Sequence, residues 1–312
     1  MENYCFGVDV GGTTVKCGLF QIDGRLLDKW EVKTNTSDNG SHILPDVAES
    51  ILAKMEEKSL KKEEIVGIGL GVPGPVDEHG VVPVAVNLHW GRKELKKEFW
   101  ELTGINTMAG NDANVAALGE MWKGGGEGYD DLIMVTLGTG VGGGIIMKGK
   151  IVAGTHGAGG EIGHAPVNPD ETESCNCGNV GCLEQVASAT GIVRLAKAEM
   201  AKCPEEKTKL NPQYLSAKSV FDAYKAGDDM AARIVERFGE FLGTALACFT
   251  CVTDPDIIVI GGGVSRAGQP LIDVVKKHYQ KHAFQACKDT PIVLAQLGND
   301  AGIYGAARLV LD

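Results

Sequence analysis

The segment FGVDVGGTTVK, residues 6–16, joins an apolar run to an aspartate, two glycines and two threonines. Its apolar flanks predict strands over residues 5–10 and 15–21, paired as a hairpin. In the turn between them, backbone N–H groups and hydroxyls can surround a phosphate while a carboxylate holds hydrated Mg²⁺. The lysine ending of a P-loop is missing, and the simpler alternative is a plain β-hairpin. The candidate phosphate-binding residues are Asp9, Gly11, Gly12, Thr13, Thr14 and Lys16.

Two more glycine-rich turns occur later, LGTGVGGG at 137–144 and IGGGVS at 260–265. The first satisfies G-x-G-x-x-G, but a strand is predicted to follow it, so the helix N-terminus that a dinucleotide pyrophosphate needs is missing. The second runs from a predicted strand into a helix, and either packs against adenine and ribose or is only a tight connection. The candidates are Gly138, Thr139, Gly140 and Gly142 for phosphate, and Gly261, Gly262 and Gly263 for the nucleoside.

Strands mixed with helices throughout the chain predict an α/β protein. A length of 312 residues exceeds what one hydrophobic core usually supports, so we expect two domains. Three glycine turns without a GxxxxGK[ST] motif fit a nucleotide clamped between two lobes, and their order resembles the actin/hexokinase/heat-shock-protein-70 superfamily. The resemblance implies a two-lobed ribonuclease-H-like (actin-like ATPase) fold with mixed central sheets and a cleft between the lobes. We expect a small lobe over 1–115, completed by a helix at 300–312, and a large lobe over 116–299.

Composition and charge exclude several classes of protein. The net charge of −11 disfavours nucleic-acid partners, because attraction to phosphate backbones needs surplus Lys and Arg. Neither a signal peptide nor a membrane-spanning run is predicted. Without an export signal, the nine cysteines are better explained as reduced thiols or metal ligands than as disulfides. We therefore expect a cytoplasmic protein.

The stretch GNDANVAALGE, residues 110–120, predicts a strand end that runs into a helix. In phosphoryl transfer one carboxylate accepts the proton of the attacking hydroxyl, so Asp112 is the candidate general base. Its neighbour Asn111 can donate to and accept from sugar hydroxyls at once. The alternative for both residues is a helix cap only.

The most specific stretch is GEIGHAPVNPDETESCNCGNVGCLE, residues 160–184. One imidazole and three thiolates, from His164, Cys175, Cys177 and Cys182, make a complete tetrahedral set for zinc without an open position for water. The sequence therefore predicts a structural rather than a catalytic zinc. The alternative is chance clustering in a cysteine-rich chain.

Two carboxylates, Glu161 and Glu184, are interleaved with these four ligands. Zinc would fix the local backbone and so aim both carboxylates at vicinal sugar hydroxyls. Alternatively they are solvated surface charges.

The motifs GVDVGGTTVK, GVPGPVD, NDANVAALGEMW, LGTGVGGGI, GEIGH, CNCGNVGCLE, ASATG and GGGVSRAG resemble, in this order, the ROK family (repressors, open reading frames, kinases) and its bacterial glucokinase branch. The resemblance implies an ATP-dependent hexokinase that phosphorylates the 6-hydroxyl of glucose, with Mg²⁺ and a structural Zn²⁺, as a homodimer or homotetramer. It implies that Asp112 is the base and that His164 both ligates zinc and contacts the sugar. The sugar-binding residues that it implies are Gly71, Asn87, Asn111, Asp112, Glu161, His164 and Glu184.

Other functions compete with this one. Within the same class, the substrate can be another hexose, such as fructose, mannose or an N-acylated amino sugar. A sugar-responsive repressor needs a DNA-reading module, and we expect none because VDVGG already begins at residue 8. A catalytically inactive sugar sensor is disfavoured because Asp112 and the glycines of the phosphate turns are all present.

Overall fold

The computed structural model describes residues 3–311, which form two compact units. Unit 1 consists of the chain up to Asp130, the segment Gly144–Gly160 and the residues from Gln296 onward. Unit 2 consists of Asp131–Gly143 and Glu161–Ala295. The chain therefore crosses between the units four times.

Unit 1 is built on a five-stranded sheet in the order β3-β2-β1-β4-β7. The strands are β1 (Tyr4–Val10), β2 (Thr14–Gln21), β3 (Leu26–Lys33), β4 (Ile65–Val72) and β7 (Thr107–Asn111). The predicted hairpin is confirmed, because β1 and β2 pair antiparallel with Val10 opposite Val15. In contrast, β1, β4 and β7 are parallel, so their carboxyl ends meet at one edge of the sheet.

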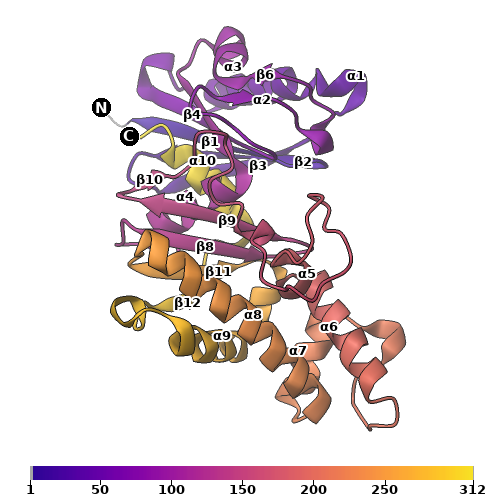
Figure 1. Cartoon of the computed structure of the whole chain (residues 1–312). Coiled ribbons are helices and arrows are strands. Elements are labelled where there is room, and N and C mark those ends of the chain that lie inside the picture. The colour runs from indigo at the N-terminus through magenta and orange to yellow at the C-terminus, as the bar shows by residue number, and fades with distance from the viewer. Residues whose placement is uncertain (1–2, 312) are drawn as a thin grey trace. The chain divides into compact units, whose positions relative to one another are not determined.

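The helices of unit 1 are α2 (Ile43–Glu57), α3 (Leu95–Thr103), α4 (Asp112–Lys123) and α10 (Ala301–Arg308). Helix α10, yellow in Figure 1, packs against β1, β4 and α4. A Cβ on Gly69 would lie 1.7 Å from the Ala306 carbonyl oxygen, and one on Gly7 would lie 1.9 Å from that of Ile303. Glycine is thus required on both strands for the backbone of α10 to approach so closely.

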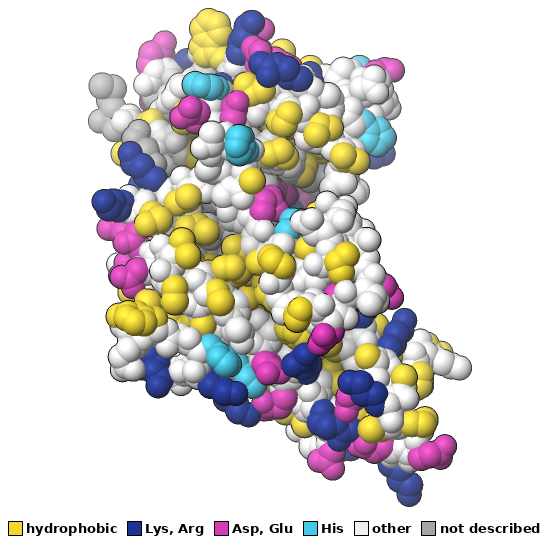
Figure 2. Space-filling view, in the orientation of Figure 1, with side chains coloured by type: hydrophobic (Ala, Val, Ile, Leu, Met, Phe, Trp, Pro, Cys, Tyr) yellow, Lys and Arg dark blue, Asp and Glu magenta, His cyan; other side chains and the backbone are white. Residues whose placement is uncertain are grey.

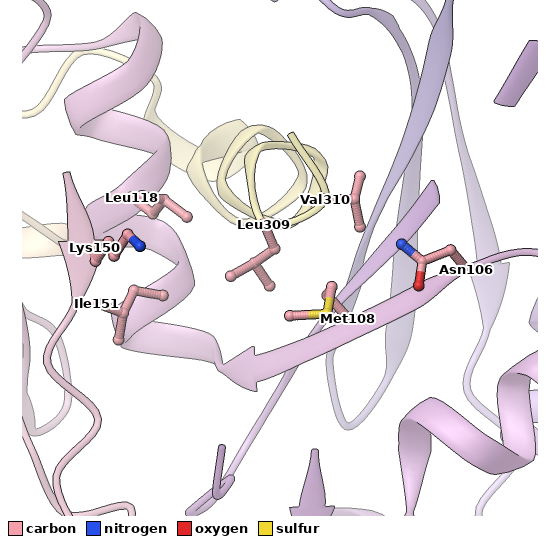
Figure 3. Close-up of a pocket in the computed structure, with 7 residues that line it drawn as sticks. All are labelled: Asn106, Met108, Leu118, Lys150, Ile151, Leu309 and Val310. Carbon is pink, nitrogen blue, oxygen red and sulfur yellow. The ribbon is translucent and has the colours of Figure 1, made fainter. Parts of the chain in front are cut away.

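The shorter elements of unit 1 connect these pieces. They are α1 (Ser37–Gly40), η1 (Lys62–Glu64), β5 (Val81–Val82), η2 (Val86–Leu88), β6 (Lys93–Glu94), β10 (Lys150–Ile151) and η7 (Gly298–Asp300). Figure 3 shows where α4, β7, β10 and the end of α10 converge in this unit.

The second sheet has the order β10-β9-β8-β11-β12. Its longer strands are β8 (Leu132–Leu137), β9 (Val141–Met147), β11 (Ile257–Gly261) and β12 (Ile292–Leu294). Strand β9 passes from unit 2 to unit 1 after Gly143. Strands β8, β11 and β12 are parallel and almost completely apolar, as expected of strands that are buried on both faces.

Unit 2 is completed by helices. They are η3 (Ile162–His164), α5 (Glu184–Ala187), α6 (Ala189–Lys202), η4 (Pro212–Tyr214), α7 (Ala217–Lys225), α8 (Asp229–Thr253), η5 (Gly263–Ala267), α9 (Gln269–His282) and η6 (Gln285–Cys287). Figure 1 shows α8 and α9 running side by side, and glycines on α8 permit this, because Gly239 and Gly243 lie directly against His278 of α9.

The observed division of the chain differs from the predicted lobes. The predicted boundary at 115/116 falls inside α4, which lies wholly in unit 1. Unit 1 also contains 144–160, which the prediction gave to the large lobe. Helix α10 belongs to unit 1 and is shorter than the predicted 300–312, of which Asp312 lies outside the described residues. Packing between residues distant in sequence sets these boundaries.

Asp228 caps α8 and gives a stability prediction. Burial alone would raise the pKa of its carboxyl, but the N–H groups of Ala231 and Lys209 donate to it, and the net shift is downward. A depressed pKa stabilises the fold above the unfolded value of about 3.9, and this contribution disappears as the pH falls through the folded value. Asp228→Asn is expected to cost about 1–3 kcal/mol in urea unfolding at pH 7, and less below about pH 4, because its NH₂ group cannot accept the Lys209 N–H while its oxygen caps the helix.

The control for Asp228→Asn is Asp229→Asn, at the exposed next position. It removes the same charge from the same helix end and is expected to change the unfolding free energy by less than about 0.5 kcal/mol. Equal effects of the two substitutions would contradict the stabilising role of the Asp228 carboxylate.

The surface carries charges of both signs. On the face shown in Figure 2, Lys and Arg side chains alternate with Asp and Glu over α6 and α7. Arg233 of α8 forms ion pairs with Glu199 of α6 and with Glu206 in the loop that follows α6. Among residues 3–311, no helix combines the length and the apolar character needed to cross a membrane.

Candidate active site

The turn Gly11–Thr14 between β1 and β2 is a closed hairpin turn. The Gly11 N–H donates to the Thr14 carbonyl at 3.1 Å, so this N–H is already used within the turn. Gly12 and Thr13 are exposed at its tip. The hydroxyl of Thr34, at the end of β3, donates to the Gly11 carbonyl at 2.6 Å, which braces the turn from the neighbouring hairpin. Of the groups predicted to surround a phosphate, those of Gly12 and Thr13 at the tip of the turn are therefore the exposed ones.

Asp9 lies beside this turn, at the carboxyl end of β1. Burial raises the pKa of its carboxyl, and the Lys16 ammonium on the paired position of β2 opposes that shift. The Lys16 ammonium also donates to the Asn299 carbonyl at 3.1 Å. On the other side, a Cβ on Gly302 would lie 2.7 Å from an Asp9 carboxylate oxygen. Asp9 is thus packed against the first turn of α10, a contact that the sequence did not predict.

Asn111 and Asp112 lie at the junction of β7 and α4. The Asn111 side-chain oxygen accepts the N–H groups of Ala113 and Asn114, so Asn111 is the N-cap of α4. One amide N–H of Asn111 donates to the Gly74 carbonyl at 3.0 Å, which leaves its second N–H for a ligand. The Asp112 carboxylate accepts the Ala113 N–H at 2.8 Å and is half-buried.

The sheet register brings the unit 1 candidates together. Gly71 is the partner of Asp9 on one side and of Gly110 on the other, so Asp9, Gly71 and Asn111 follow one another across the carboxyl edge. Ligands of open α/β sheets bind at such edges. The exposed Asn87 lies against the Gly11–Thr14 turn, because a Cβ on Gly12 would be 3.5 Å from the Asn87 carbonyl oxygen.

In unit 2, the turn at 138–142 is held by Glu184. The Val141 N–H donates to one carboxylate oxygen of Glu184 at 3.0 Å, and a Cβ on Gly140 would lie 2.0 Å from the same oxygen. Thr139 is exposed, and its carbonyl accepts the Thr190 hydroxyl at 2.8 Å. The sequence predicted Glu184 as a sugar ligand only, and nothing in its spacing indicated this contact with the turn.

The third glycine turn lies next to the second. Strands β8 and β11 are parallel with Thr136 opposite Gly261, so both turns leave the same edge of the sheet. Gly262 has φ 83°, and a Cβ there would lie 2.5 Å from the Leu137 carbonyl oxygen. Glycine is therefore required at Gly262 both by its backbone conformation and by the close approach. Gly261 and Gly263 flank it, and Gly142 follows Val141 on β9.

His164, Cys175, Cys177 and Cys182 come together as the sequence predicted. Their potential ligand atoms all lie within 4.8 Å of one another. The His164 Nδ1 is 3.7 Å from the Cys175 Sγ, and the Cys177 and Cys182 sulfurs are 3.6 Å apart. Ligands at about 2.3 Å from a tetrahedral zinc are about 3.8 Å apart, so the donor set fits this ion.

The environments of the thiols differ. Burial, together with the hydrogen-bonded neighbours Cys177 and Cys175, raises the pKa of Cys182 to about 12. In contrast, the Asn179 N–H lowers the pKa of the exposed Cys177. A dication is required to hold all three sulfurs as thiolates, because without it their charges repel one another.

The two ring nitrogens of His164 face different partners. Its Nδ1 faces the Cys175 sulfur, whereas its Nε2 lies 3.9 Å from a carboxylate oxygen of the exposed Glu161. This segment is fixed against β9, because a Cβ on Gly163 would lie 2.0 Å from the Val141 carbonyl oxygen. In unit 2, Glu161, His164, Glu184 and the turn at 138–142 therefore gather around Val141.

A separate pocket in unit 1 contains none of the predicted site residues. Its volume is about 240 Å³, and Figure 3 shows its lining, namely Asn106, Met108, Leu118, Lys150, Ile151, Leu309 and Val310. Its mostly apolar walls do not match a phosphate or a sugar, which need convergent polar groups.

The class of fold follows from these features: mixed α/β sheets with glycine turns at the carboxyl edges are those of the actin-like ATPases. A ROK hexokinase from Thermus thermophilus superposes with a TM-score of 0.80 at 32% identity, over 98% of this chain and 97% of that one. The chain belongs to the ROK family, whose sequence profile matches residues 5–312.

Two further proteins resemble the chain over nearly its whole length. A glucokinase of Halalkalibacterium halodurans is 42% identical over 314 residues, which cover 99% of this chain and 95% of the relative. A ROK family glucokinase from Streptomyces griseus, solved in complex with glucose and AMPPNP, superposes with a TM-score of 0.73 at 32% identity, over 98% of this chain and 99% of that one.

Proposed function

We propose that this protein is a glucokinase that transfers the terminal phosphoryl group of Mg-ATP to the 6-hydroxyl of glucose. The observation that carries the proposal is the carboxyl edge of the unit 1 sheet, where Asp9, Gly71 and Asn111 are neighbours and Asp112 follows directly. A carboxylate for Mg²⁺ and a carboxylate for the sugar hydroxyl thus follow strands of the same sheet, β1 and β7, with β4 between them. The similarity to proteins named glucokinase supports the same conclusion.

In the proposed reaction, Asp112 accepts the proton of the 6-hydroxyl while that oxygen attacks the phosphoryl group. Asn111, through its second amide N–H, Gly71 at the end of β4 and Asn87 of η2 bind sugar hydroxyls. The glycine turns bind the phosphates and the nucleoside, and Asp9 and Lys16 complete the phosphate end. When bound, Mg²⁺ neutralises charge that develops on the phosphate oxygens.

For unit 2 we propose that the Glu161 carboxylate accepts a hydrogen bond from a sugar hydroxyl and that the Nε2–H of His164 donates one. Zinc bound to Nδ1 would hold the imidazole ring in place. Zinc would be held by His164, Cys175, Cys177 and Cys182 and would serve structure alone, since the four donors fill its tetrahedron. Glu184 then links the metal loop to the phosphate turn, because its second carboxylate oxygen lies 3.8 Å from the Cys175 sulfur. Cytoplasmic location and a homodimer or homotetramer stay predictions.

A hexose panel tests the proposal. ADP release with Mg-ATP is measured over glucose, mannose, fructose and N-acetylglucosamine, and zinc is quantified in the same sample. We expect kcat/KM for glucose to exceed the others by at least about tenfold, because a buried hydroxyl contact discriminates strongly. Preference for another hexose would replace glucose by that sugar, and no turnover with any of them would overturn the kinase assignment.

A further inference from the structure

Glu120, near the end of α4, has a role that the proposed reaction does not use. It is completely buried, and its carboxylate accepts three backbone N–H groups. Gly125 donates at 2.8 Å and Gln296 at 3.0 Å to one oxygen, and Leu297 donates at 2.8 Å to the other. A Cβ on Gly124 would lie 2.0 Å from this carboxylate. A glycine at this position therefore leaves the space that the Glu120 carboxylate occupies.

The position of this carboxylate is unfavourable for α4 itself. An acidic side chain in the last turns of a helix faces the negative end of the helix dipole, and a buried carboxylate loses its hydration. Three N–H donors offset both costs, and all of them belong to segments outside the helix. The carboxylate thus organises those segments rather than α4.

The two segments adjoin two of the four connections between the units. Gly125 precedes the crossing at 130/131, and Gln296 follows the crossing at 295/296. At the crossing at 295/296, two adjacent residues are anchored in different units. The Ala295 N–H donates to Ile260 in unit 2, whereas the N–H of the next residue, Gln296, donates to Glu120 in unit 1.

The first crossing is equally abrupt. The Asp130 carbonyl accepts the Gly149 N–H in unit 1, and the Asp131 carbonyl accepts the Asp256 N–H in unit 2, both at 2.9 Å. Adjacent residues are therefore anchored in different units at both of these crossings. At each of the two, only a few backbone dihedral angles lie between the two anchors, as in a short hinge.

We propose that Glu120 is a positioning residue that anchors the unit 1 side of the crossing at 295/296 and the loop that leads to the crossing at 130/131. This inference rests on the proposed function, which assigns groups to both units. Without the Glu120 carboxylate, Gln296 loses its anchor and the connection at 295/296 gains freedom, so fewer molecules hold the reacting groups in register. The connection at 130/131 keeps its anchor, because Gly149 still donates to the Asp130 carbonyl.

Glu120→Gln is the test, because it keeps the size of the side chain but replaces one acceptor oxygen by an NH₂ group that cannot accept the N–H facing it. Hydrogen exchange of the full-length protein is expected to accelerate at least about tenfold at 124–126 and 296–297 only. With the preferred hexose, kcat/KM is expected to fall about 10- to 100-fold. Glu120→Asp, which is one methylene shorter, should show the same exchange pattern.

Asp228→Asn is the matched control, because Asp228 is also a buried carboxylate that accepts backbone N–H groups, but within unit 2. It should accelerate exchange only around 208–231 and leave kcat/KM within about twofold. Wild-type exchange at 124–126 and 296–297 in Glu120→Gln, or an equal kinetic loss in Asp228→Asn, would overturn this role of Glu120. The exchange result stands even if no hexose is phosphorylated, so failure of this role and failure of the proposed function are distinguishable.

Discussion

Asp112→Asn is expected to lower kcat with glucose by about 10²- to 10⁴-fold, the range that a positioned general base contributes. The amide is as large as the carboxylate but cannot take up the proton of the 6-hydroxyl. Its side-chain oxygen can still accept the Ala113 N–H, so α4 should begin as before. The glucose KM should stay within a few fold, because ground-state contacts are kept. Steady-state kinetics with Mg-ATP measure both values.

The control for this substitution is Asp46→Asn, which removes a carboxylate from the first turn of α2 in the same unit. It should leave kcat unchanged. If Asp112→Asn retains near-normal turnover while the wild type phosphorylates glucose, Asp112 is not the base, and the kinase assignment itself is unaffected.

Removal of the proposed zinc is expected to have the second large effect. Cys177→Ser replaces a thiolate, in the set whose ligand atoms lie within 4.8 Å, by a hydroxyl that binds zinc poorly. We expect zinc content to fall from about one per chain to a small fraction, and glucose affinity to fall about 100-fold or more, because Glu161 and His164 lose their fixed positions. Metal analysis and calorimetric glucose titration measure these changes, and a strong chelator should reproduce them.

Nucleotide binding should survive in part after metal loss. The glycine turns at 138–142 and 261–263 are built on β8 and β11, which do not depend on the metal loop. Some loss is expected, because Glu184 connects the turn to the neighbourhood of Cys175. Cys248→Ser, at an exposed cysteine of α8, is the control and should change neither property. Fully active, chelator-treated protein without stoichiometric metal would contradict the zinc prediction.

Local patterns in the sequence predicted the local structure well. The apolar runs on either side of Gly11 and Gly12 indicated the β1–β2 hairpin, which is confirmed. The spacing of His164 and the three cysteines indicated a tetrahedral ligand set, and the structure brings those side chains together. In both cases the residues that determine the feature are close in sequence, so their spacing along the chain is enough to predict that they lie together.

Contacts between distant residues could not be predicted in this way. The side chain of Thr34 braces the Gly11–Thr14 turn, and Glu184 binds the turn at 138–142, but neither residue differs in type or spacing from an ordinary surface residue.

The structural role of Asn111, in contrast, could be predicted from the sequence. Its helix-capping role was the simpler alternative at the sequence level, and the structure bears it out, leaving one N–H for the proposed sugar contact.

The close packing of α10 on Gly7 and Gly69 has a consequence for synthesis of the protein in the cell. Strand β1 is translated before unit 2, whereas α10 is translated only after the whole of unit 2. At about 5–20 residues per second this delay is roughly 15–60 s. During that time the glycine-lined face of β1 and β4 lacks its cover, and the nascent sheet is exposed to chaperones and to pairing with other chains.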